Sequence, residues 1–276
     1  MAEIVAAFGI PHTPSFVATV AKEGPEAPVA KLFQSIKNYL DDVKPDVIVK
    51  FDSDHWNTFF YDNWPTFAVG ISNETAGPID QTPSMPWYKV LVDESLGQHI
   101  QNVGVNNGFD LSFTKEFLID HSILVPLHFL TPNMQIPIVP IFINTFVPPM
   151  PSANRCHDLG KMVRKAIESW PNKKRVVIMA SGSLSLEVGG PRMFEGKTFG
   201  VPDPIWAERV VKYFESSNIN ELVKNSTTEQ IAHAGNIAGE ILNFIALLGV
   251  VGEKKPIFLE TQLELGNAFV AWRLDK

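Results

Sequence analysis

Short apolar runs alternate with amphipathic segments along this chain. Residues 4–8 and 47–51 are apolar runs of strand length, which predicts two buried strands. Residues 26–42 between them carry apolar side chains at helical spacing, namely Val29, Phe33, Ile36 and Leu40. A strand, a helix and a strand with short connections form a βαβ unit, so the pattern favours a largely parallel sheet that is covered by helices.

The same alternation continues to the end of the chain. It predicts further strands at residues 66–71, 111–113, 136–143, 175–180 and 268–272. It predicts further helices at residues 87–103, 123–130, 152–170, 203–214 and 227–248, and a polar surface excursion at residues 72–86. No internal repeat or shift in composition marks a domain boundary. We therefore expect a single α/β domain over residues 1–276, with a mostly parallel or mixed central sheet and helices on both faces.

Two of these helices begin with recognisable capping residues. Asp203 followed by Pro204 has the pattern of an N-cap and a proline at the first helical position. Ser226 with Glu229 three residues later has the pattern of a capping box, which predicts the start of the helix at residues 227–248.

The composition narrows the class of protein. The net charge of −7 and the scattered positions of the 23 lysines and arginines argue against a general role on nucleic acid. The single cysteine, Cys156, excludes an internal disulfide and fits a reducing compartment, and we see no signal peptide. No stretch approaches the roughly 20 uninterrupted apolar residues of a spanning helix. We therefore expect a cytoplasmic protein that binds neither nucleic acid nor membrane.

Two of the predicted strands are followed by histidines. His12 lies between Pro11 and Pro14, which restrict the backbone around it. His55 ends the acidic stretch 52–55, where a neighbouring carboxylate could orient its ring. Two neutral imidazoles from separate strand ends suit a divalent metal ion, with a third ligand from elsewhere. Each histidine also has an interpretation without a metal. His12 would then be a hydrogen-bonded loop histidine, and residues 52–55 would be an acidic turn that closes a strand.

Glu240 is the most informative carboxylate. It lies among apolar and small residues at the edge of the apolar stripe of its predicted helix, where a solvated glutamate is the structural alternative. Ala238 and Gly239 beside it would allow the close approach of another element. A carboxylate that is buried there would need a compensating charge, which a metal ion can supply.

The ends of the predicted strands also suggest where a substrate could bind. In open α/β sheets, ligands gather outside the carboxyl ends of the strands. His12, His55, Asn144 and the loop at residues 181–192 all follow predicted strands. We therefore expect them to meet at one rim of the sheet, with Asn144 and Arg192 as candidate substrate contacts.

His121 is a different kind of candidate. It follows Asp120 at the predicted start of a helix, so it could act as an acid/base group or as a donor to the substrate. A histidine that only begins a helix is the structural alternative. A P-loop is not supported, because Gly196-Lys197-Thr198 lacks the upstream glycine, and no Gly-x-Ser-x-Gly nucleophile elbow occurs.

Together these motifs resemble the class III extradiol ring-cleavage dioxygenases, the superfamily of the protocatechuate 4,5-dioxygenase beta subunit. The resemblance covers nearly the whole chain and rests on the order of Pro11-His12, Asp54-His55, Asp120-His121, Val125-Pro126-Leu127, Arg155-Cys156, Gly182, Gly190-Pro191-Arg192, Gly239-Glu240 and Leu265-Gly266. It implies an α/β domain that holds Fe(II) with His12, His55 and Glu240. It also implies that His121 lies near the substrate oxygens and that Thr261 lies near a ring substituent.

One position departs from the family pattern. The family's acid/base histidine belongs in the loop after the strand at residues 175–180, and Leu186 stands in its place. Leucine can neither accept nor donate a proton, and positioned proton transfer is typically worth about 10²–10⁴-fold in rate. Either His121 or Glu187 takes over this role, or the substrate needs no such transfer, or the reaction differs.

Three hypotheses about function follow. The leading one is a non-haem Fe(II)-dependent extradiol-type dioxygenase that inserts O₂ into a small catecholic or related hydroxylated aromatic compound. The second is a metal-dependent, non-oxidative hydrolase or lyase that uses the same ligands, and the third is a catalytically silent relative. The resemblance further implies that the chain forms a homo-oligomer, and pairing with a small second subunit is the open alternative.

Overall fold

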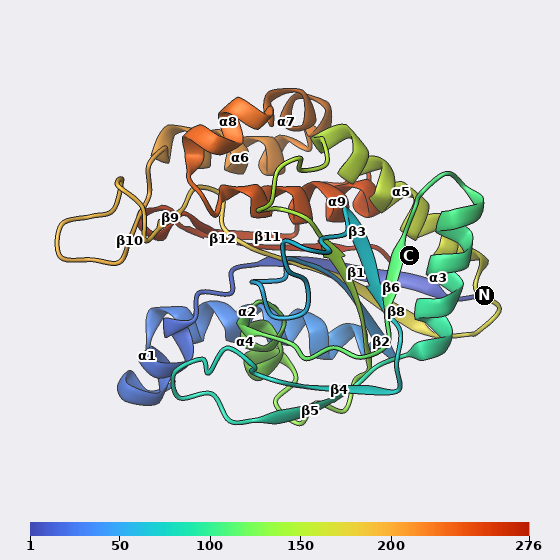
Figure 1. The fold of residues 1–276 in the computed structure, drawn as a ribbon. Coiled ribbons are helices and arrows are strands. Elements are labelled where there is room, and N and C mark those ends of the chain that lie inside the picture. Colours follow the sequence, from blue (N-terminus) through green and yellow to red (C-terminus); the bar gives the residue numbers. More distant parts are fainter. Residues whose placement is uncertain (276) are drawn as a thin grey trace.

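Residues 1–275, which the computed structural model describes, form a central sheet of eight strands (Figure 1). In spatial order the strands are β11 (Phe258–Gln262), β12 (Asn267–Arg273), β1 (Glu3–Ile10), β8 (Arg175–Ser181), β2 (Val47–Asp52), β7 (Ile138–Ile143), β3 (Phe67–Gly70) and β6 (Ser112–Thr114). The four strands β1, β8, β2 and β7 run parallel, as do β3 and β6. Strand β12 is antiparallel to β1 and β11, and β3 is antiparallel to β7. The sheet is therefore mixed and mostly parallel.

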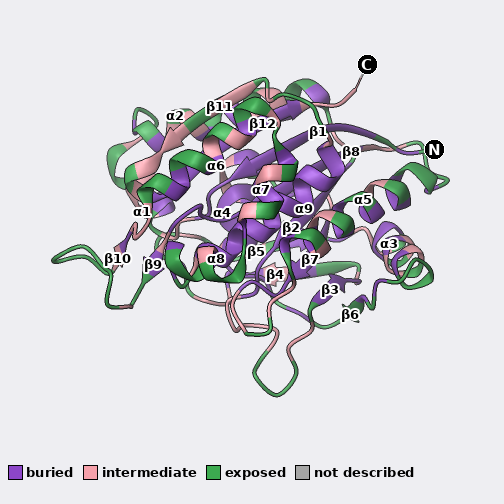
Figure 2. Cartoon of the chain, turned by 90° about the horizontal axis from the view of Figure 1, so that it is seen from above, coloured by how far each residue is buried: buried purple, intermediate pink, exposed green. Residues whose placement is uncertain are grey.

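Helices cover both faces of this sheet. One face is covered by α1 (Ser15–Glu23), α2 (Pro28–Val43) and α4 (His121–Leu130). The other face is covered by α3 (Glu94–Asn106), α5 (Ala153–Ser169), α6 (Pro204–Ser216), α7 (Ile219–Asn225), α8 (Thr228–Ala234) and α9 (Ile241–Val251). Figure 2 shows the sheet and α9 as a buried layer beneath outer helices with exposed faces. The predicted α/β fold class is confirmed.

Strand β2 shows why the sheet needs helices on both sides. Its side chains alternate, so that Val49 and Phe51 join the core beneath α5 and α9, whereas Ile48 joins the core beneath α2 and α4. All six residues of the strand are buried. A strand buried on both faces reads as a continuous apolar run, which is how the sequence revealed it.

The prediction of a helix over residues 87–103 is wrong in its first part. Strand β5 (Tyr88–Leu91) pairs with β4 (Glu74–Gly77) in a separate antiparallel ribbon, and helix α3 begins only at Glu94. The Asp93 side chain accepts a hydrogen bond from the Leu96 N–H at 3.0 Å and so caps α3. The predicted surface excursion at residues 72–86 therefore contains a strand.

The prediction of one long helix over residues 227–248 is also wrong. Thr227, not Ser226, caps α8, and α8 ends at Ala234. Ser226 instead donates its hydroxyl to the Leu222 carbonyl at the end of α7, a helix that the pattern did not reveal. A second helix, α9, begins at Ile241 after a single 3₁₀ turn at Ala238–Glu240.

Tertiary hydrogen bonds explain the break between α8 and α9. The Ile237 N–H donates to the Leu186 carbonyl at 3.1 Å, and the Asn236 N–H donates to the Glu187 carboxylate at 3.2 Å. These donors would otherwise continue a helix, so the loop after β8 has taken over the backbone bonds of this segment. Glu240 therefore lies in the break and not on a continuous helical stripe.

Several smaller elements complete the structure. The predicted N-cap Asp203 is confirmed, because its side chain accepts a hydrogen bond from the Trp206 N–H at 2.9 Å. Strands β9 (Glu187–Val188) and β10 (Phe199–Gly200) form a hairpin that projects from the body (Figure 1). The pattern did not reveal β11, an edge strand. Among the described residues, no helix combines the length and apolar character that crossing a bilayer requires.

Candidate metal centre

The parallel strands bring the predicted site residues to one edge of the sheet. β1 ends at Ile10, β2 ends at Asp52 and β8 ends at Ser181, and in parallel strands these ends lie on the same side. His12 follows the first of these ends and His55 follows the second. Both rings lie beside each other, with centroids 5.4 Å apart.

Glu240 meets both of these histidines through a single carboxylate oxygen. Its Oε1 lies 2.9 Å from His12 Nε2 and 3.4 Å from His55 Nε2. The Glu240 side chain has no exposed surface, and His12 is 5% exposed. The two short distances are not aligned as hydrogen bonds, so Oε1 is a buried oxygen without a hydrogen-bond partner.

The second Glu240 oxygen is held by the loop that follows β8. The Ser183 N–H donates to Oε2 at 2.9 Å, which fixes the carboxylate with Oε1 toward the histidines. Gly182 makes this approach possible, because a Cβ at that position would lie 2.5 Å from the Glu240 Cβ. Its φ of +153° also lies where side chains are rarely found.

Asp120 orients His55 from the N-terminus of α4. Its Oδ2 accepts a hydrogen bond from the His55 backbone N–H at 3.0 Å and lies 3.1 Å from His55 Nδ1. Its Oδ1 accepts from the Ser122 N–H at 2.8 Å and thereby caps the helix. One buried carboxylate therefore fixes both a helix start and the ring of His55, with Nε2 directed at Glu240.

The acidic stretch at residues 52–55 does not supply the carboxylate that orients His55. Asp54 instead accepts the backbone N–H groups of Asn57, Thr58 and Phe59, which closes the turn after His55. Asp52 pairs with Lys50 inside the sheet. The residue adjacent in sequence was thus the wrong candidate for orienting the ring, because the turn uses that carboxylate.

His121 joins the group from the first position of α4. Its ring centroid lies 4.4 Å from that of His55 and 5.3 Å from that of His12. One nitrogen from each of these three imidazoles lies within 4.8 Å of the others. His121 Nδ1 contacts the carboxylate of Asp80, a residue of the loop between β4 and β5. We call His12, His55, His121 and Glu240 the histidine–glutamate cluster.

The donor atoms of this cluster fit a divalent cation. Two ring nitrogens and one carboxylate oxygen converge, and donors about 3 Å apart suit one ion with bonds of about 2.1 Å at right angles. The unpartnered Glu240 Oε1 requires a positive charge in the same place, because an isolated buried carboxylate is very costly. The residues present therefore fit a bound metal ion.

The charge states of Glu240 and His12 are those of metal ligands, whereas His55 favours its protonated form while no ion is bound. Burial acts to raise the pKa of Glu240, but the His12 and His55 imidazoles outweigh it and lower that pKa to about 2. Burial lowers the pKa of His12, so its ring is neutral, as a metal ligand must be. Burial also acts to lower the pKa of His55, but the Asp120 and Glu240 carboxylates hold it well above its usual range.

An aromatic wall stands beside His55. The Phe146 ring lies 5.1 Å from the His55 ring and stacks on Trp56 at 5.4 Å, with 20° between the two planes. Trp56 has a φ of +59°, which is a strained conformation for a bulky residue, and its indole N–H has no partner. Strain of this kind is characteristic of functional sites. The wall gives the cluster a flat apolar side.

Asn144 acts through the turn that carries Phe146. Its Oδ1 accepts from the Val147 N–H at 2.9 Å, and its Nδ2 donates to the Val147 carbonyl at 2.7 Å. The side chain is 5% exposed and is used by its own turn. Asn144 therefore holds the turn that carries Phe146 and uses one of its two amide N–H donors there, so its role as a substrate contact stays a prediction.

Three other predicted site residues do not contact the cluster in any described hydrogen bond or ion pair. Arg192 pairs with Glu187 at 2.8 Å and donates to the carbonyls of Ala232 and His233. Glu187 is 3% exposed and also accepts the Asn236 N–H, so its carboxylate helps to hold the helix break. Thr261 lies on the edge strand β11, opposite Ala268 of β12.

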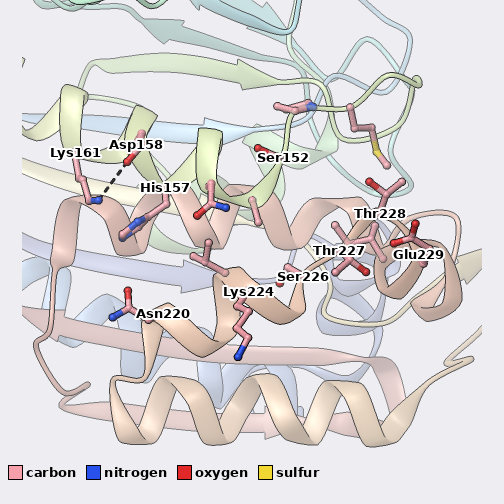
Figure 3. A pocket seen from close by; sticks show the side chains of 16 residues that line it. Ser152, His157, Asp158, Lys161, Asn220, Lys224, Ser226, Thr227, Thr228 and Glu229 are labelled. Carbon is pink, nitrogen blue, oxygen red and sulfur yellow. Dashed lines mark hydrogen bonds and ion pairs between the residues drawn. The ribbon is translucent and has the colours of Figure 1, made fainter.

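A polar groove of about 570 Å³ lies apart from the cluster, between α5, α7 and the start of α8 (Figure 3). Figure 3 shows its lining of polar side chains, which includes Ser152, Lys224 and Thr227, and the ion pair between Lys161 and Asp158. None of the four cluster residues lines this groove. The candidate chemistry and the groove are therefore separate features.

Sequence similarity identifies the family to which these residues belong. Residues 6–268 match the family described as the catalytic LigB subunit of aromatic ring-opening dioxygenase. The chain belongs to this family. Because the match extends over nearly the whole chain, the LigB family assignment confirms the resemblance to class III extradiol dioxygenases.

Individual relatives with curated names share a quarter to a third of their aligned residues with this chain. A 2,3-dihydroxyphenylpropionate/2,3-dihydroxicinnamic acid 1,2-dioxygenase from Photorhabdus laumondii is 31% identical over 66% of this chain and 56% of its own length. An enzyme of the same name from Klebsiella pneumoniae is 25% identical over 79% of this chain and 80% of its own length. The chain thus aligns with little more than half of the first relative.

A solved structure shares the fold. An uncharacterized protein from Escherichia coli K12 has a TM-score of 0.63, with 97% of this chain and 99% of that chain covered. The two sequences are 16% identical, so the similarity extends to the fold alone.

Sequence reasoning missed several residues that support the cluster. Asp80, Ser181 and Asn243 contact it or its nearest neighbours from segments remote in sequence. Asn243, for example, donates to the Ser181 carbonyl at 3.0 Å and to the Ser53 hydroxyl at 2.9 Å. The one signal available was polar residues in otherwise apolar segments, such as Asn243 in α9 and Lys50 in β2.

Proposed function

We propose that this protein is a non-haem Fe(II)-dependent extradiol-type dioxygenase that acts on a small catecholic or related hydroxylated aromatic compound. The observation that carries the proposal is the convergence of His12 Nε2 and His55 Nε2 on the unpartnered Oε1 of Glu240. Two histidines and one carboxylate on one side of an ion form the ligand set of non-haem Fe(II) oxygenases. Membership of the LigB family supports the same reaction class.

His12, His55 and Glu240 would hold the iron in this proposal. Bound Fe(II) supplies a Lewis acid with open positions for substrate and O₂ and a route for electrons between them. The overall reaction breaks one ring C–C bond and places both oxygen atoms of O₂ in the product, so no external reductant is required. The chain's own task is to hold the substrate and to manage its protons.

We assign the proton-handling role to His121, supported by Asp80. The Asp80 carboxylate contacts His121 Nδ1, which leaves Nε2 free, and one nitrogen of His121 lies within 4.8 Å of a nitrogen of both His12 and His55. A histidine oriented by a carboxylate in this way is suited to general acid/base chemistry. Glu187 is a weaker candidate because Arg192 and the Asn236 N–H occupy its carboxylate. Leu186 offers no proton at all.

The aromatic wall would position the substrate ring. Phe146 and Trp56 present flat apolar faces beside His55, and an aromatic ring packs favourably on such faces. Stacking would also exclude water from the side of the cluster where the ring is cleaved. The relatives named for 2,3-dihydroxyphenylpropionate indicate a catechol with a short acidic side chain as the first compound to test.

The direct test is anaerobic reconstitution with Fe(II), followed by O₂ uptake with a panel of catechols, aminophenols and 2,3-dihydroxyphenylpropionate. We expect one iron per chain, and O₂ consumption with at least one compound. Absence of bound iron, or uptake that no compound changes, would refute the proposal. Turnover that persists without O₂, or with Zn(II) in place of iron, would instead identify the hydrolase or lyase alternative.

Two variants locate the activity at the cluster. His12→Ala is expected to abolish metal binding. In a catalytically silent relative without a metal site, the same substitution would leave the metal content unchanged. His121→Asn is expected to retain the iron but to lower kcat by about 10²–10⁴-fold, the usual worth of positioned proton transfer. If His121→Asn loses the metal instead, then His121 is a ligand and the assignment of roles is wrong.

We also propose that the protein is cytoplasmic and self-associates, and that its partners are O₂ and the aromatic substrate. The single cysteine is free and fully buried, so the chain forms no internal disulfide, which fits a reducing compartment. Light scattering of the purified chain, alone and after co-expression with neighbouring small open reading frames, would measure self-association and any second subunit. A monomer with full activity would contradict the oligomer.

A further inference from the structure

Lys50 is a lysine without exposed surface in the middle of the sheet. It lies on β2 in the position that alternates with Val49 and Phe51, so its side chain is directed at the face that α4 covers. Burying an ammonium group is costly unless it is paired and its donors are all bound. The partners of Lys50 are therefore informative.

Each of the three donors of the Lys50 ammonium has one acceptor. Nζ lies 2.6 Å from Asp52 Oδ2, 3.0 Å from the Ser122 carbonyl oxygen and 2.9 Å from Ser181 Oγ. An ammonium group has three N–H donors and no acceptor, so these contacts account for it completely. Lys50 is a fixed cation and not a mobile side chain.

The Ser122 carbonyl is available because of a proline inside α4. In an α-helix this carbonyl would accept the backbone N–H of residue 126, four positions later. Residue 126 is Pro126, which has no N–H. The carbonyl therefore accepts from Lys50, and Pro126 leaves it free to do so.

The hydroxyl of Ser181 then has only one free role. It has a single proton, and two acceptors lie within reach of it, Asp52 Oδ1 at 2.6 Å and the Ser122 carbonyl oxygen at 3.0 Å. Lys50 donates to one lone pair of Oγ. The remaining lone pair faces His12 Nδ1, which lies 2.9 Å away. Ser181 must accept a hydrogen bond from His12 and cannot donate one.

We propose that Lys50, Asp52 and Ser181 form a positioning unit that keeps His12 protonated on Nδ1 and leaves its Nε2 lone pair for the metal. The inference rests on the proposed function only in that Nε2 is taken to bind a metal ion. A second observation agrees with it: the His12 Nε2–Glu240 Oε1 contact is not aligned as a hydrogen bond, so Nε2 is not the donor. His12 has one N–H, and only Ser181 can receive it.

The two ligand histidines are thus oriented by different kinds of group. His55 donates to Asp120, an anion, whereas His12 donates to a neutral hydroxyl that is backed by the cation of Lys50. A carboxylate partner raises the basicity of an imidazole. His12 is therefore the weaker electron donor of the two histidines. The residues that make it so, Lys50, Asp52 and Ser181, lie on strands β2 and β8 of the sheet.

The test uses Ser181→Ala, with Ser226→Ala as the matched control. Ser226 is also a buried serine, but its hydroxyl donates to the Leu222 carbonyl at the end of α7 and contacts no residue of the cluster. In Ser181→Ala we expect the Kd for Zn(II), measured by competition with a chelating dye, to rise by about 10–100-fold, the range for orienting partners of ligand histidines. Ser226→Ala should bind Zn(II) like the wild type.

A spectroscopic measurement separates positioning from a general loss of structure. In the Zn(II)-loaded wild type, labelled with ¹⁵N-histidine, the Nδ1–H of His12 should exchange slowly with solvent, and in Ser181→Ala it should exchange fast. The double variant Lys50→Met/Asp52→Asn removes both charges together and should weaken Zn(II) binding in the same direction. Circular dichroism checks that each variant is folded.

The outcomes distinguish this inference from the proposed function. If Ser181→Ala keeps wild-type affinity and a slowly exchanging His12 Nδ1–H, the positioning unit is refuted although the metal site stands. If the folded double variant binds Zn(II) like the wild type, Lys50 and Asp52 have no part in it. If the wild type itself binds neither Zn(II) nor Fe(II), then the proposed function has failed.

Discussion

Glu240 Oε1 and His12 Nε2 lie 2.9 Å apart inside the protein without forming an aligned hydrogen bond. Two groups with lone pairs do not remain this close unless a positive charge lies between or beside them. The Asp120 and Glu240 carboxylates also hold the pKa of His55 above its usual range, against the effect of burial. These carboxylates therefore favour a positive charge at this place. A protonated His55 supplies this charge from the chain itself, and a metal ion that displaces the proton would supply it in the proposed holoenzyme.

Glu240→Gln should remove the stabilisation that a metal ion gives to the folded protein. A ligand at about 100 times its Kd stabilises by about 2.7 kcal/mol, so calorimetry of the wild type should show a clear rise in Tm with Zn(II) or Fe(II). We expect no such rise in Glu240→Gln, because the amide lacks the charge. Exposed Glu260 on β11 provides the control variant Glu260→Gln, which should respond like the wild type. An equal rise in Glu240→Gln would exclude this carboxylate as a ligand.

Asp120→Asn and Asp54→Asn compare the carboxylate that touches the His55 ring with the one that precedes it in sequence. Asp120 lies 3.1 Å from His55 Nδ1, whereas Asp54 accepts backbone N–H groups of the following turn. We expect Asp120→Asn to weaken Zn(II) binding by about 10–100-fold and Asp54→Asn to change it much less. Titration under identical conditions measures both. The reverse order would show that the turn, and not the carboxylate contact, controls His55.

Gly182→Ala should displace Glu240. The new Cβ would lie 2.5 Å from the Glu240 Cβ, so the backbone or the carboxylate has to move. We expect a loss of about 1–3 kcal/mol in unfolding free energy, as for other overpacked sites, together with weaker metal binding. Gly189→Ala is the control in the same loop, because it adds backbone strain but meets no atom within 4 Å. Urea unfolding and metal titration of both variants would reveal the difference, and normal metal binding by Gly182→Ala would contradict the prediction.

Asp203 should make stability depend on pH in the acid range. Burial acts to raise the pKa of this carboxyl, but the Trp206 N–H, Gln230 and His233 outweigh it and lower the pKa. Stabilisation by the ionised form is therefore complete above the unfolded-state pKa of about 3.9 and is lost as pH falls through the lower folded-state value.

Asp203→Asn isolates the charge, since asparagine is an equally good N-cap. The wild type should be the more stable at pH 7, and its advantage should shrink below about pH 4. Asp203→Ala also loses the cap and should be less stable by about 1 kcal/mol at pH 7. Urea unfolding at pH 7 and in acid measures these differences. An advantage of the wild type that grows in acid would show that the sign is wrong.

Local patterns determined much of the fold because they depend on neighbours in the sequence. The apolar runs of β1, β2 and β8 and the stripe of α2 record burial directly, and Asp203 caps α6 by contacts within one turn. The predicted helix over residues 87–103 was wrong in its first part because strand β5 forms by pairing with β4, which is not a neighbour in the sequence. Their local pattern contains no information about that partner.

The sequence by itself determined which residues are chemically unusual here: His12 between prolines, His55 after a strand, Glu240 among apolar residues, and the leucine at 186. Only the tertiary structure decided how they act. Hydrogen bonds from the loop after β8 break the helix before Glu240, Asp120 reaches His55 across 65 positions, and Ser181 reaches His12 across 169. The reason is physical, because a buried polar group takes whichever partner the fold brings within about 3 Å, and sequence distance has no part in that choice.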